Sequence, residues 1–260
     1  MHGFADMHAH VLFGLDDGPN TVQDSIALLR AAYADGIRIL VATPHVHSIN
    51  HADYAEKYRA AFSAAQNAAR QIAPDFRLLP GNELLAFSGC GDAIRSGHVL
   101  TLGGTALVLT EFPVQIDLQT MTARLSEIQY AGYQPVLAHA ERYSCLADNK
   151  LKCLSEMKKR GILLQINAQT VISPGFFYKN TLKKMFVSGL IDFVATDAHS
   201  VAHRPPRMKK AYQILKTWCG EQAARDLCGD RFLRLFKQPK GASTCPISSR
   251  SSSHVPRQSI

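Results

Sequence analysis

The chain of 260 residues has no apolar run near the roughly 20 residues that a membrane-spanning helix needs. We expect no signal peptide either, because Asp6 and three histidines (His2, His8 and His10) occupy the place where such a peptide has an apolar stretch. We therefore expect a cytoplasmic protein with no membrane insertion.

Paired cysteines are also lacking. The six cysteines lie at positions 90, 145, 153, 219, 228 and 245, and no two are spaced as C-x-x-C, which argues against a zinc knuckle or a thioredoxin-type pair. Without a secretion signal they are best interpreted as free thiols. Cys219 and Arg225 have the C-x5-R spacing of cysteine-dependent phosphatases, but Trp218 precedes the cysteine in a helical stretch and Glu221 would repel phosphate. We expect no cysteine nucleophile.

The glycine motifs G-x-x-x-x-G-K-[ST] and G-x-G-x-x-G and the serine motif G-x-S-x-G are absent as well. The formal net charge is +8, and half of it comes from residues 237–260, which contain four Lys or Arg and no acid. The mild excess on residues 1–236 forms no dense Lys/Arg stripe with interleaved aromatics, so we expect no nucleic-acid partner. Such an excess favours an anionic substrate.

What the sequence does contain is a regular alternation of short apolar runs and longer segments of helical period. The runs predict strands at 4–9, 37–43, 76–83, 106–112, 134–140, 162–168 and 191–196, and the periodic segments predict helices at 21–36, 53–73, 117–132, 145–160, 178–189 and 206–229. This alternation indicates an α/β fold with a parallel sheet, and seven strands fit either a closed barrel or a doubly wound sheet.

No change in composition divides residues 1–236, so we expect one domain there. Residues 237–260 are rich in Ser and Pro and lack a periodic apolar face, which predicts a disordered basic tail.

Histidines and acids follow the carboxyl ends of six of the seven predicted strands. They are His8, His10 and Asp17 after the first strand, then His45, Glu83, Glu111 and His139, and finally Asp197 and His199 after the seventh. The sixth strand offers only Asn167. Active sites of barrels and open α/β sheets gather at these strand ends, and a metal ion compensates the cost of burying such groups.

Nine candidate ligands exceed the needs of one ion, so we predict two or three divalent ions bridged by carboxylates such as Glu83 or Asp197. Imidazole mixed with carboxylate, without thiolate, suits Mn, Fe, Zn or Co. Clusters of this type activate a bridging water and bind the oxygens of a phosphoryl group.

Two arginines lie close to ligand positions: Arg142 in HAERY and Arg204 in DAHSVAHRPP. Since guanidinium groups bind phosphate oxygens with a planar fork of donors, we take both arginines, with Asp197 and His199, as the catalytic group. His47 and His51 remain open: one could support the ligands or donate a proton to the leaving group, and both could equally be solvated.

The motifs DMHAH, LDDGP, ATPH, GNE, LTEF, LAHAERY, INAQ and TDAH, followed by HRPPRM, occur in order from about residue 3 to about residue 236. In this the chain resembles the polymerase and histidinol phosphatase (PHP) family, and within it the CpsB-like and YwqE-like bacterial protein-tyrosine phosphatases of capsule and exopolysaccharide operons. The resemblance implies a distorted TIM-like (β/α)7 barrel with a trinuclear, usually manganese-dependent site at the carboxyl ends of its strands.

For the site, the resemblance implies that the nine residues above are the metal ligands and that Arg142 and Arg204 contact phosphate. The implied substrate is the phosphotyrosine-containing tail of a bacterial tyrosine autokinase that controls capsular or exopolysaccharide synthesis and export.

Two alternatives remain. The same chemistry could act on a small phosphomonoester such as histidinol phosphate, against which the combination of DDGP, HAERY and RPP argues. The chain could also be a non-catalytic PHP domain that binds DNA or a polymerase, although such degenerate domains usually lose ligands and here all nine positions are filled.

Overall fold

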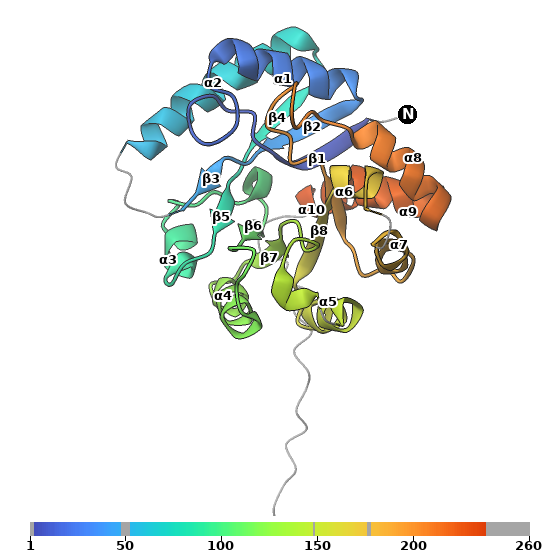
Figure 1. Cartoon of the computed structure of the whole chain (residues 1–260). Coiled ribbons are helices and arrows are strands. Elements are labelled where there is room, and N and C mark those ends of the chain that lie inside the picture. Colours follow the sequence, from blue (N-terminus) through green and yellow to red (C-terminus); the bar gives the residue numbers. More distant parts are fainter. Residues whose placement is uncertain (1–2, 48–52, 148, 176–177, 238–260) are drawn as a thin grey trace, which may run out of the picture.

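The computed structural model describes residues 3–47, 53–147, 149–175 and 178–237, and its strands line a central barrel with helices around the outside (Figure 1). The strands are β1 (Phe4–Ala9), β2 (Ile37–Ala42), β3 (His45–Val46), β4 (Arg77–Pro80), β5 (Glu83–Leu85), β6 (Leu107–Glu111), β7 (Gln134–Leu137), β8 (Leu163–Asn167) and β9 (Phe193–Ala195). The helices are α1 (Val22–Ala34), α2 (Tyr54–Ile72), α3 (Cys90–Arg95), α4 (Leu118–Tyr130), α5 (Lys150–Lys159), α6 (Ala168–Ile172), α7 (Lys179–Val187), α8 (Met208–Cys219), α9 (Glu221–Arg225) and α10 (Arg231–Phe236).

The strands pair in parallel in two sheets, ordered β1-β2-β4 and β3-β5-β6-β7-β8-β9. Because β2 pairs with β4 and β3 pairs with β5, the short strands β3 and β5 extend β2 and β4 across a break. The described strands therefore occupy seven positions around the barrel, one for each predicted strand.

The barrel closes where β1 meets the end of β9. Ala9 forms a parallel bridge with Ala198, and the backbone N–H of His10 donates to the carbonyl of Ala198 at 2.8 Å. One residue earlier, the N–H of Asp197 donates to the carbonyl of His8 at 2.8 Å. The predicted distorted TIM-like barrel is confirmed.

The break within the third predicted strand, residues 76–83, corrects our expectation of one continuous strand. It falls at Gly81, whose N–H donates to the buried hydroxyl of Tyr58 at 3.1 Å and whose carbonyl accepts from the same hydroxyl at 3.2 Å. The hydroxyl replaces the missing sheet partners, so both backbone hydrogen-bonding groups of Gly81 are satisfied at the break. In the neighbouring strand the break contains Pro44, which has no N–H to donate.

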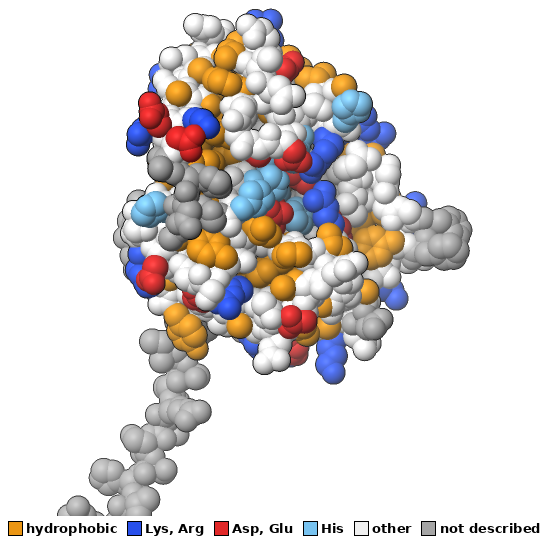
Figure 2. All heavy atoms as spheres, turned by 60° about the vertical axis from the view of Figure 1, so that its left-hand side comes forward, with side chains coloured by type: hydrophobic (Ala, Val, Ile, Leu, Met, Phe, Trp, Pro, Cys, Tyr) orange, Lys and Arg blue, Asp and Glu red, His pale blue; other side chains and the backbone are white. Residues whose placement is uncertain are grey.

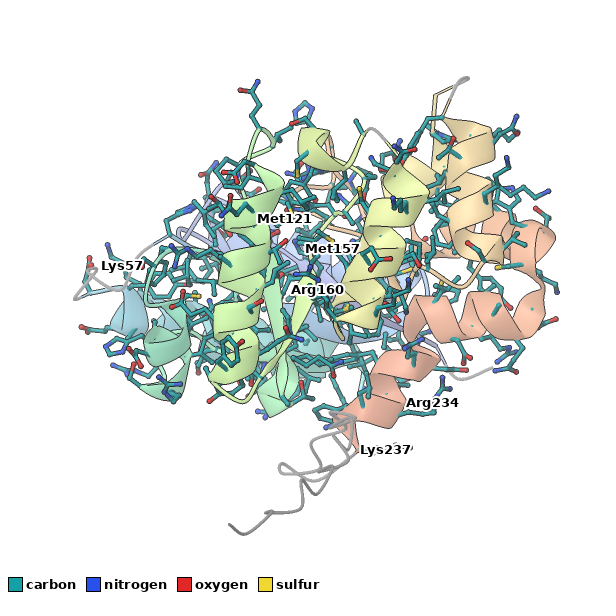
Figure 3. The ribbon with its side chains drawn as sticks, turned by 90° about the horizontal axis from the view of Figure 1, so that it is seen from below. Lys57, Met121, Met157, Arg160, Arg234 and Lys237 are labelled. Atoms are coloured by element: carbon teal, nitrogen blue, oxygen red, sulfur yellow. The ribbon has the colours of Figure 1, made fainter. Side chains whose placement is uncertain are left out.

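The outer helices bury one apolar face each against the barrel. In α1, Leu28 and Leu29 are fully buried, and the Thr21 hydroxyl caps the helix by accepting from the N–H of Asp24 at 3.2 Å. Met121 of α4 and Met157 of α5, marked in the view from below in Figure 3, are buried in the same core.

The predicted helix at 206–229 is wrong as a single element. α8 ends at Gly220, which has a φ of 86°, and the chain continues through α9 and a π turn (Asp226–Asp230) into α10. The helix predicted at 145–160 begins only at Lys150, after a 3₁₀ turn, and the short helices α3 and α6 were not expected. Apart from Lys237, the predicted tail at 237–260 lies outside the described residues. Among the described helices, none is both long and apolar enough to cross a membrane.

Helix α10 covers the amino end of the barrel, opposite the ligand-bearing strand ends. Phe232 is 1% exposed and packs with Ala5 and Met7 of β1 in the barrel interior. Figure 3 marks Arg234 on α10. The turn into α10 passes so close to β1 that a Cβ on Gly229 would lie 2.4 Å from the backbone nitrogen of Ala5.

We expect Gly229→Ala to destabilise the protein by about 3 kcal/mol or more, because it adds a backbone clash to a φ of 143° that side chains rarely adopt. Gly220→Ala is the matched control: its φ is also positive, but its Cβ would meet open space, so the cost should be about 1 kcal/mol. Urea unfolding of both variants measures the difference, and equal losses would contradict the close approach of α10 to β1.

Candidate metal centre

The nine predicted ligands come together at the carboxyl ends of the strands. Their side-chain nitrogen and oxygen atoms lie 2.7–3.7 Å from one another in a continuous network. Figure 2 shows histidine, acidic and basic side chains gathered in the middle of this face. The residues of the network are His8, His10, Asp17, His45, Glu83, Glu111, His139, Asp197 and His199.

Glu83, at the start of β5, is the centre of this network and is 1% exposed. Its Oε2 lies 3.0 Å from Nε2 of His8, 3.0 Å from Nε2 of His10 and 3.3 Å from Nδ1 of His45. Its Oε1 lies 2.9 Å from Nε2 of His139. One carboxylate therefore faces four imidazoles, the arrangement expected of a bridging ligand.

Asp197, just after β9, connects the histidines to the arginines. Its Oδ1 lies 3.4 Å from Nε2 of His8, whereas its Oδ2 accepts from Nη2 of Arg142 at 3.0 Å and from Nη2 of Arg204 at 2.6 Å. The amide of Asn167 donates to the same Oδ2 at 2.7 Å. Asp197 has a φ of 52°, a conformation that is uncommon for non-glycine residues and that clusters at functional sites.

The outer edge of the network consists of Asp17 and Glu111. Asp17 is 61% exposed, and its Oδ1 lies 3.4 Å from Nε2 of His45 and 3.1 Å from Nε2 of His199. Oε1 of Glu111 lies 2.7 Å from Nδ1 of His45. The network thus extends from the buried floor of the barrel to its solvent-exposed mouth.

Eight of the nine side chains, all except His139, fall into three overlapping groups, and within each group the potential ligand atoms lie within 4.8 Å of one another. The groups are His8, His10, Glu83 and Asp197; His45, Glu83 and Glu111; and His10, Asp17, His45 and His199. Among the described residues, three buried atoms of this network have no well-aligned hydrogen bond: Nδ1 of His45, Oε2 of Glu83 and Nε2 of His199. Such convergent unsatisfied imidazole and carboxylate atoms fit divalent cations.

The pKa values of the network also fit the binding of divalent cations. Burial disfavours the imidazolium form of His10, but hydrogen bonds to Asp16 and Glu83 outweigh burial and raise its pKa to about 10. Burial would raise the pKa of Glu83, yet the surrounding histidines, His8 foremost, hold that pKa well below its usual value. Burial and repulsion from His10 lower the pKa of His199 to about 4. Glu83 therefore stays ionised, and metal binding here would displace a proton from His10.

Asp16, which was not among the predicted residues, holds two of the histidines in place. Its Oδ2 lies 2.7 Å from Nδ1 of His10 and accepts from the N–H of His45 at 3.0 Å, and its Oδ1 accepts from the N–H of Gly18 at 3.0 Å. Burial raises the pKa of Asp16, but the hydrogen bond to His10 outweighs it and the pKa falls to about 2. A carboxylate on the far nitrogen of a histidine fixes the ring's tautomer and orientation. The two adjacent acids of LDDGP were the sequence signal for Asp16, but only Asp17 was predicted as a site residue.

Gln165 in β8 was missed as well. Its Oε1 lies 3.2 Å from Nδ1 of His8 and accepts from the N–H of His139 at 2.9 Å, while its Nε2 donates to Oδ1 of Asn167 at 2.8 Å. The sixth strand, which offers no ligand, therefore supports ligands from other strands. Its signal was the two-residue spacing of Gln165 and Asn167, which places both on one face of the strand.

We expect Asp16→Asn to lower the metal affinity of the site about 10–100-fold, because the neutral amide holds His10 less firmly as a ligand. Titration of the metal-stripped protein with Mn²⁺, followed by calorimetry, measures this. Asp24→Asn is the control, since Asp24 is an exposed acid of the next helix whose hydrogen bonds within the described part of the chain are to Thr21. Unchanged affinity in Asp16→Asn would contradict the supporting role of Asp16.

Beyond Asp197 the site opens into a cavity of about 250 Å³ whose lining includes Arg142, Asn167 and Arg204. Of the two histidines left open by the sequence, His47 is exposed and its ring lies 5.3 Å from that of His45. His51 lies outside the described residues.

Comparison with known proteins matches residues 4–235 to the family described as "Capsular polysaccharide synthesis, CpsB/CapC". The chain belongs to the CpsB/CapC family. This confirms the resemblance drawn from the motifs.

Individual members of the CpsB/CapC family are similar in sequence to this chain over most of their length. The tyrosine-protein phosphatase CpsB of Streptococcus pneumoniae is 32% identical over 231 residues, 86% of this chain and 95% of the relative. The tyrosine-protein phosphatase YwqE of Bacillus subtilis is 30% identical over 245 residues, 90% of this chain and 94% of the relative. A solved structure from work on YwqE and CpsB as metal-dependent tyrosine phosphatases has a TM-score of 0.75 and 28% identity, covering 91% of this chain and 96% of that one.

The cysteine motif of this CpsB/CapC member lies away from the centre. Cys219 is the last residue of α8, and burial raises the pKa of its thiol, which keeps it protonated and weakly nucleophilic. Its Sγ donates to the carbonyl of Leu215 at 3.2 Å. The expectation that Cys219 and Arg225 form no phosphatase loop agrees with this helical setting.

Proposed function

We propose that this chain is a metal-dependent protein-tyrosine phosphatase that hydrolyses phosphotyrosine in a protein substrate. The observation that carries the proposal is the sharing of Asp197: one of its oxygens faces the histidines, and the other holds the two arginines that border the cavity. A site of this kind combines metal ligands with two donors for phosphoryl oxygens.

We assign the nine clustered residues as ligands of two or three divalent ions, with manganese as the native metal. Ions bound there would supply a hydroxide nucleophile and neutralise charge on the phosphoryl group. Arg142 and Arg204 bind the non-bridging phosphoryl oxygens, and Asp197 holds both guanidinium groups in place. His199, against the exposed Asp17, completes the rim that the substrate meets first.

The substrate we infer is the phosphotyrosine-containing tail of a bacterial tyrosine kinase that controls capsular or exopolysaccharide synthesis. The family's description as a capsular polysaccharide synthesis family supports this inference. We infer a cytoplasmic setting, which the free thiols of Cys90, Cys145, Cys219 and Cys228 support.

We further propose that residues 1–236 form the complete phosphatase domain and that the basic segment 237–260 is dispensable for hydrolysis. The family match to residues 4–235 supports this division. A chain ending at Phe236 should keep the kcat and KM of the full chain on a phosphotyrosyl peptide.

The deciding experiment measures hydrolysis of a phosphotyrosyl peptide and of histidinol phosphate after reconstitution with Mn, Fe, Zn or Co, with bound metal counted per chain. We expect the peptide to be hydrolysed with the higher kcat/KM and two or three ions to be bound. A higher kcat/KM on histidinol phosphate would show that the substrate is a small phosphomonoester and not a phosphoprotein. Tight, salt-sensitive DNA binding without hydrolysis of either ester would overturn the enzyme assignment.

A further inference from the structure

The cavity beside the metal centre has a third arginine that the catalytic assignment does not use. Arg207 lines the cavity together with Arg142, Arg204 and His203. The acid that lines it, Asp197, is already bonded to the first two arginines. With histidine neutral, the lining side chains therefore carry a net charge of +2.

Arg207 is unpaired within the part of the chain that the structure describes. Arg142 and Arg204 each bond to Asp197, whereas the Arg207 guanidinium has no ion pair and no hydrogen bond there. Its side chain is exposed at the residue before α8. A charged group that lines a cavity without an internal partner is free to bind a ligand of opposite charge.

A tight loop and two prolines fix the position of this arginine. The N–H groups of His199 and Ser200 both donate to the carbonyl of Arg204, at 3.0 and 3.4 Å, which folds residues 199–204 back on themselves. Pro205 and Pro206 then restrict the backbone between Arg204 and Arg207. Both arginines are thus placed on the cavity by one rigid segment that starts at the ligand His199.

The segment that carries Arg207 is basic. Residues 198–210, which form the loop at the cavity and the start of α8, contain four Lys or Arg residues and no acid. Figure 2 shows basic side chains next to the histidines at the mouth of the site. An anionic chain approaching from this side meets cations and no exposed acid of that segment, which favours its association.

We propose that Arg207 forms a second anion-binding subsite, which recognises an acidic side chain next to the phosphotyrosine of the substrate. This proposal rests on the proposed phosphatase function and adds the class of peptide that the enzyme prefers. Since liquid water takes roughly 30 Å³ per molecule, a cavity of about 250 Å³ has room for a phosphate group and a neighbouring carboxylate. Arg142 and Arg204 hold the phosphoryl group, and Arg207 binds the flanking carboxylate.

The test uses two phosphotyrosyl peptides that differ only in having Asp or Asn on both sides of the phosphotyrosine. We expect the manganese-loaded enzyme to hydrolyse the Asp peptide with a KM about fivefold lower, the size of effect for one partly exposed charge pair. Arg207→Gln should abolish this preference and leave kcat on p-nitrophenyl phosphate unchanged. Arg207→Glu should reverse the preference toward a peptide flanked by Lys.

Arg160→Gln is the matched control, because Arg160 is an exposed arginine without an ion pair in the described structure at the opposite end of the barrel (Figure 3). It should keep the full preference for Asp. Fluorescence anisotropy with the same two peptides, carrying a non-hydrolysable phosphotyrosine analogue, measures binding without turnover. Equal KM and equal affinity for both peptides in the wild-type enzyme would overturn the subsite. If neither phosphopeptide is hydrolysed but the analogues bind with the Asp preference, the phosphatase proposal fails and the subsite stands.

Discussion

Asp197→Asn should reduce kcat/KM on a phosphotyrosyl peptide by about 10³-fold or more and lower the number of bound metal ions. The substitution removes the carboxylate that faces His8 on one side and holds Arg142 and Arg204 on the other. Metal binding and the placement of both arginines are therefore impaired together. Steady-state kinetics and elemental analysis of the purified variant measure the two effects.

The matched control is Asp192→Asn, at the other end of the same strand. Asp192 is buried, and it accepts from the N–H of Leu164 at 2.9 Å and pairs with Lys158 at 2.6 Å and Arg231 at 2.8 Å. Its loss should lower the free energy of unfolding by about 2 kcal/mol, because both cations are partly solvated, and should leave kcat nearly unchanged. Metal content and turnover that survive in Asp197→Asn would refute the role of Asp197.

Removal of metal should abolish hydrolysis completely. Dialysis against a strong chelator is expected to leave no measurable turnover, because in the metal-free protein only the two arginines bind the phosphoryl oxygens. Added Mn²⁺ should restore turnover. The midpoint of thermal unfolding should fall by several degrees, since a ligand that binds only the folded state stabilises it. Rates and unfolding curves before and after chelation test both expectations.

Alkylation of the thiols is the matching negative control. Among the described cysteines Cys90 and Cys228 are buried, and burial raises the pKa of the Cys219 thiol, so iodoacetamide should leave turnover unchanged. Turnover that survives chelation and disappears on alkylation would favour a cysteine nucleophile and refute the metal mechanism.

The sequence predicts the seven strand positions because each strand is a short apolar run followed by a polar turn. The interruption of the third strand could not be foreseen, because the hydroxyl that satisfies Gly81 belongs to Tyr58, 23 residues away along the chain. The division of the last helix had local signals in Gly220 and Gly229. An apolar helical period runs through them, however, and it outweighed the glycines in our prediction.

The gathering of the candidate ligands was predictable, because carboxyl ends of parallel strands share one rim. The pattern could not tell which of two adjacent acids contacts a histidine, because Asp16 and Asp17 have the same side chain. Only the conformation of the loop directs Asp16 toward Nδ1 of His10. Gln165 was hidden for a different reason. The spacing of Gln165 and Asn167 places both amides on one face of the strand, but which imidazole Gln165 supports is seen only when the strands are placed side by side.

The closure of the barrel between β1 and β9 has a consequence for folding. Its hydrogen bonds join residues almost 190 positions apart in sequence, so this seam forms only when the whole ring of strands is assembled, and contacts of such long range form slowly. His8 and His10 stand on one side of the seam, and Asp197 and His199 on the other. A half-folded chain consequently has no complete set of metal ligands. The enzyme becomes able to bind its metal ions in the same step in which the barrel closes.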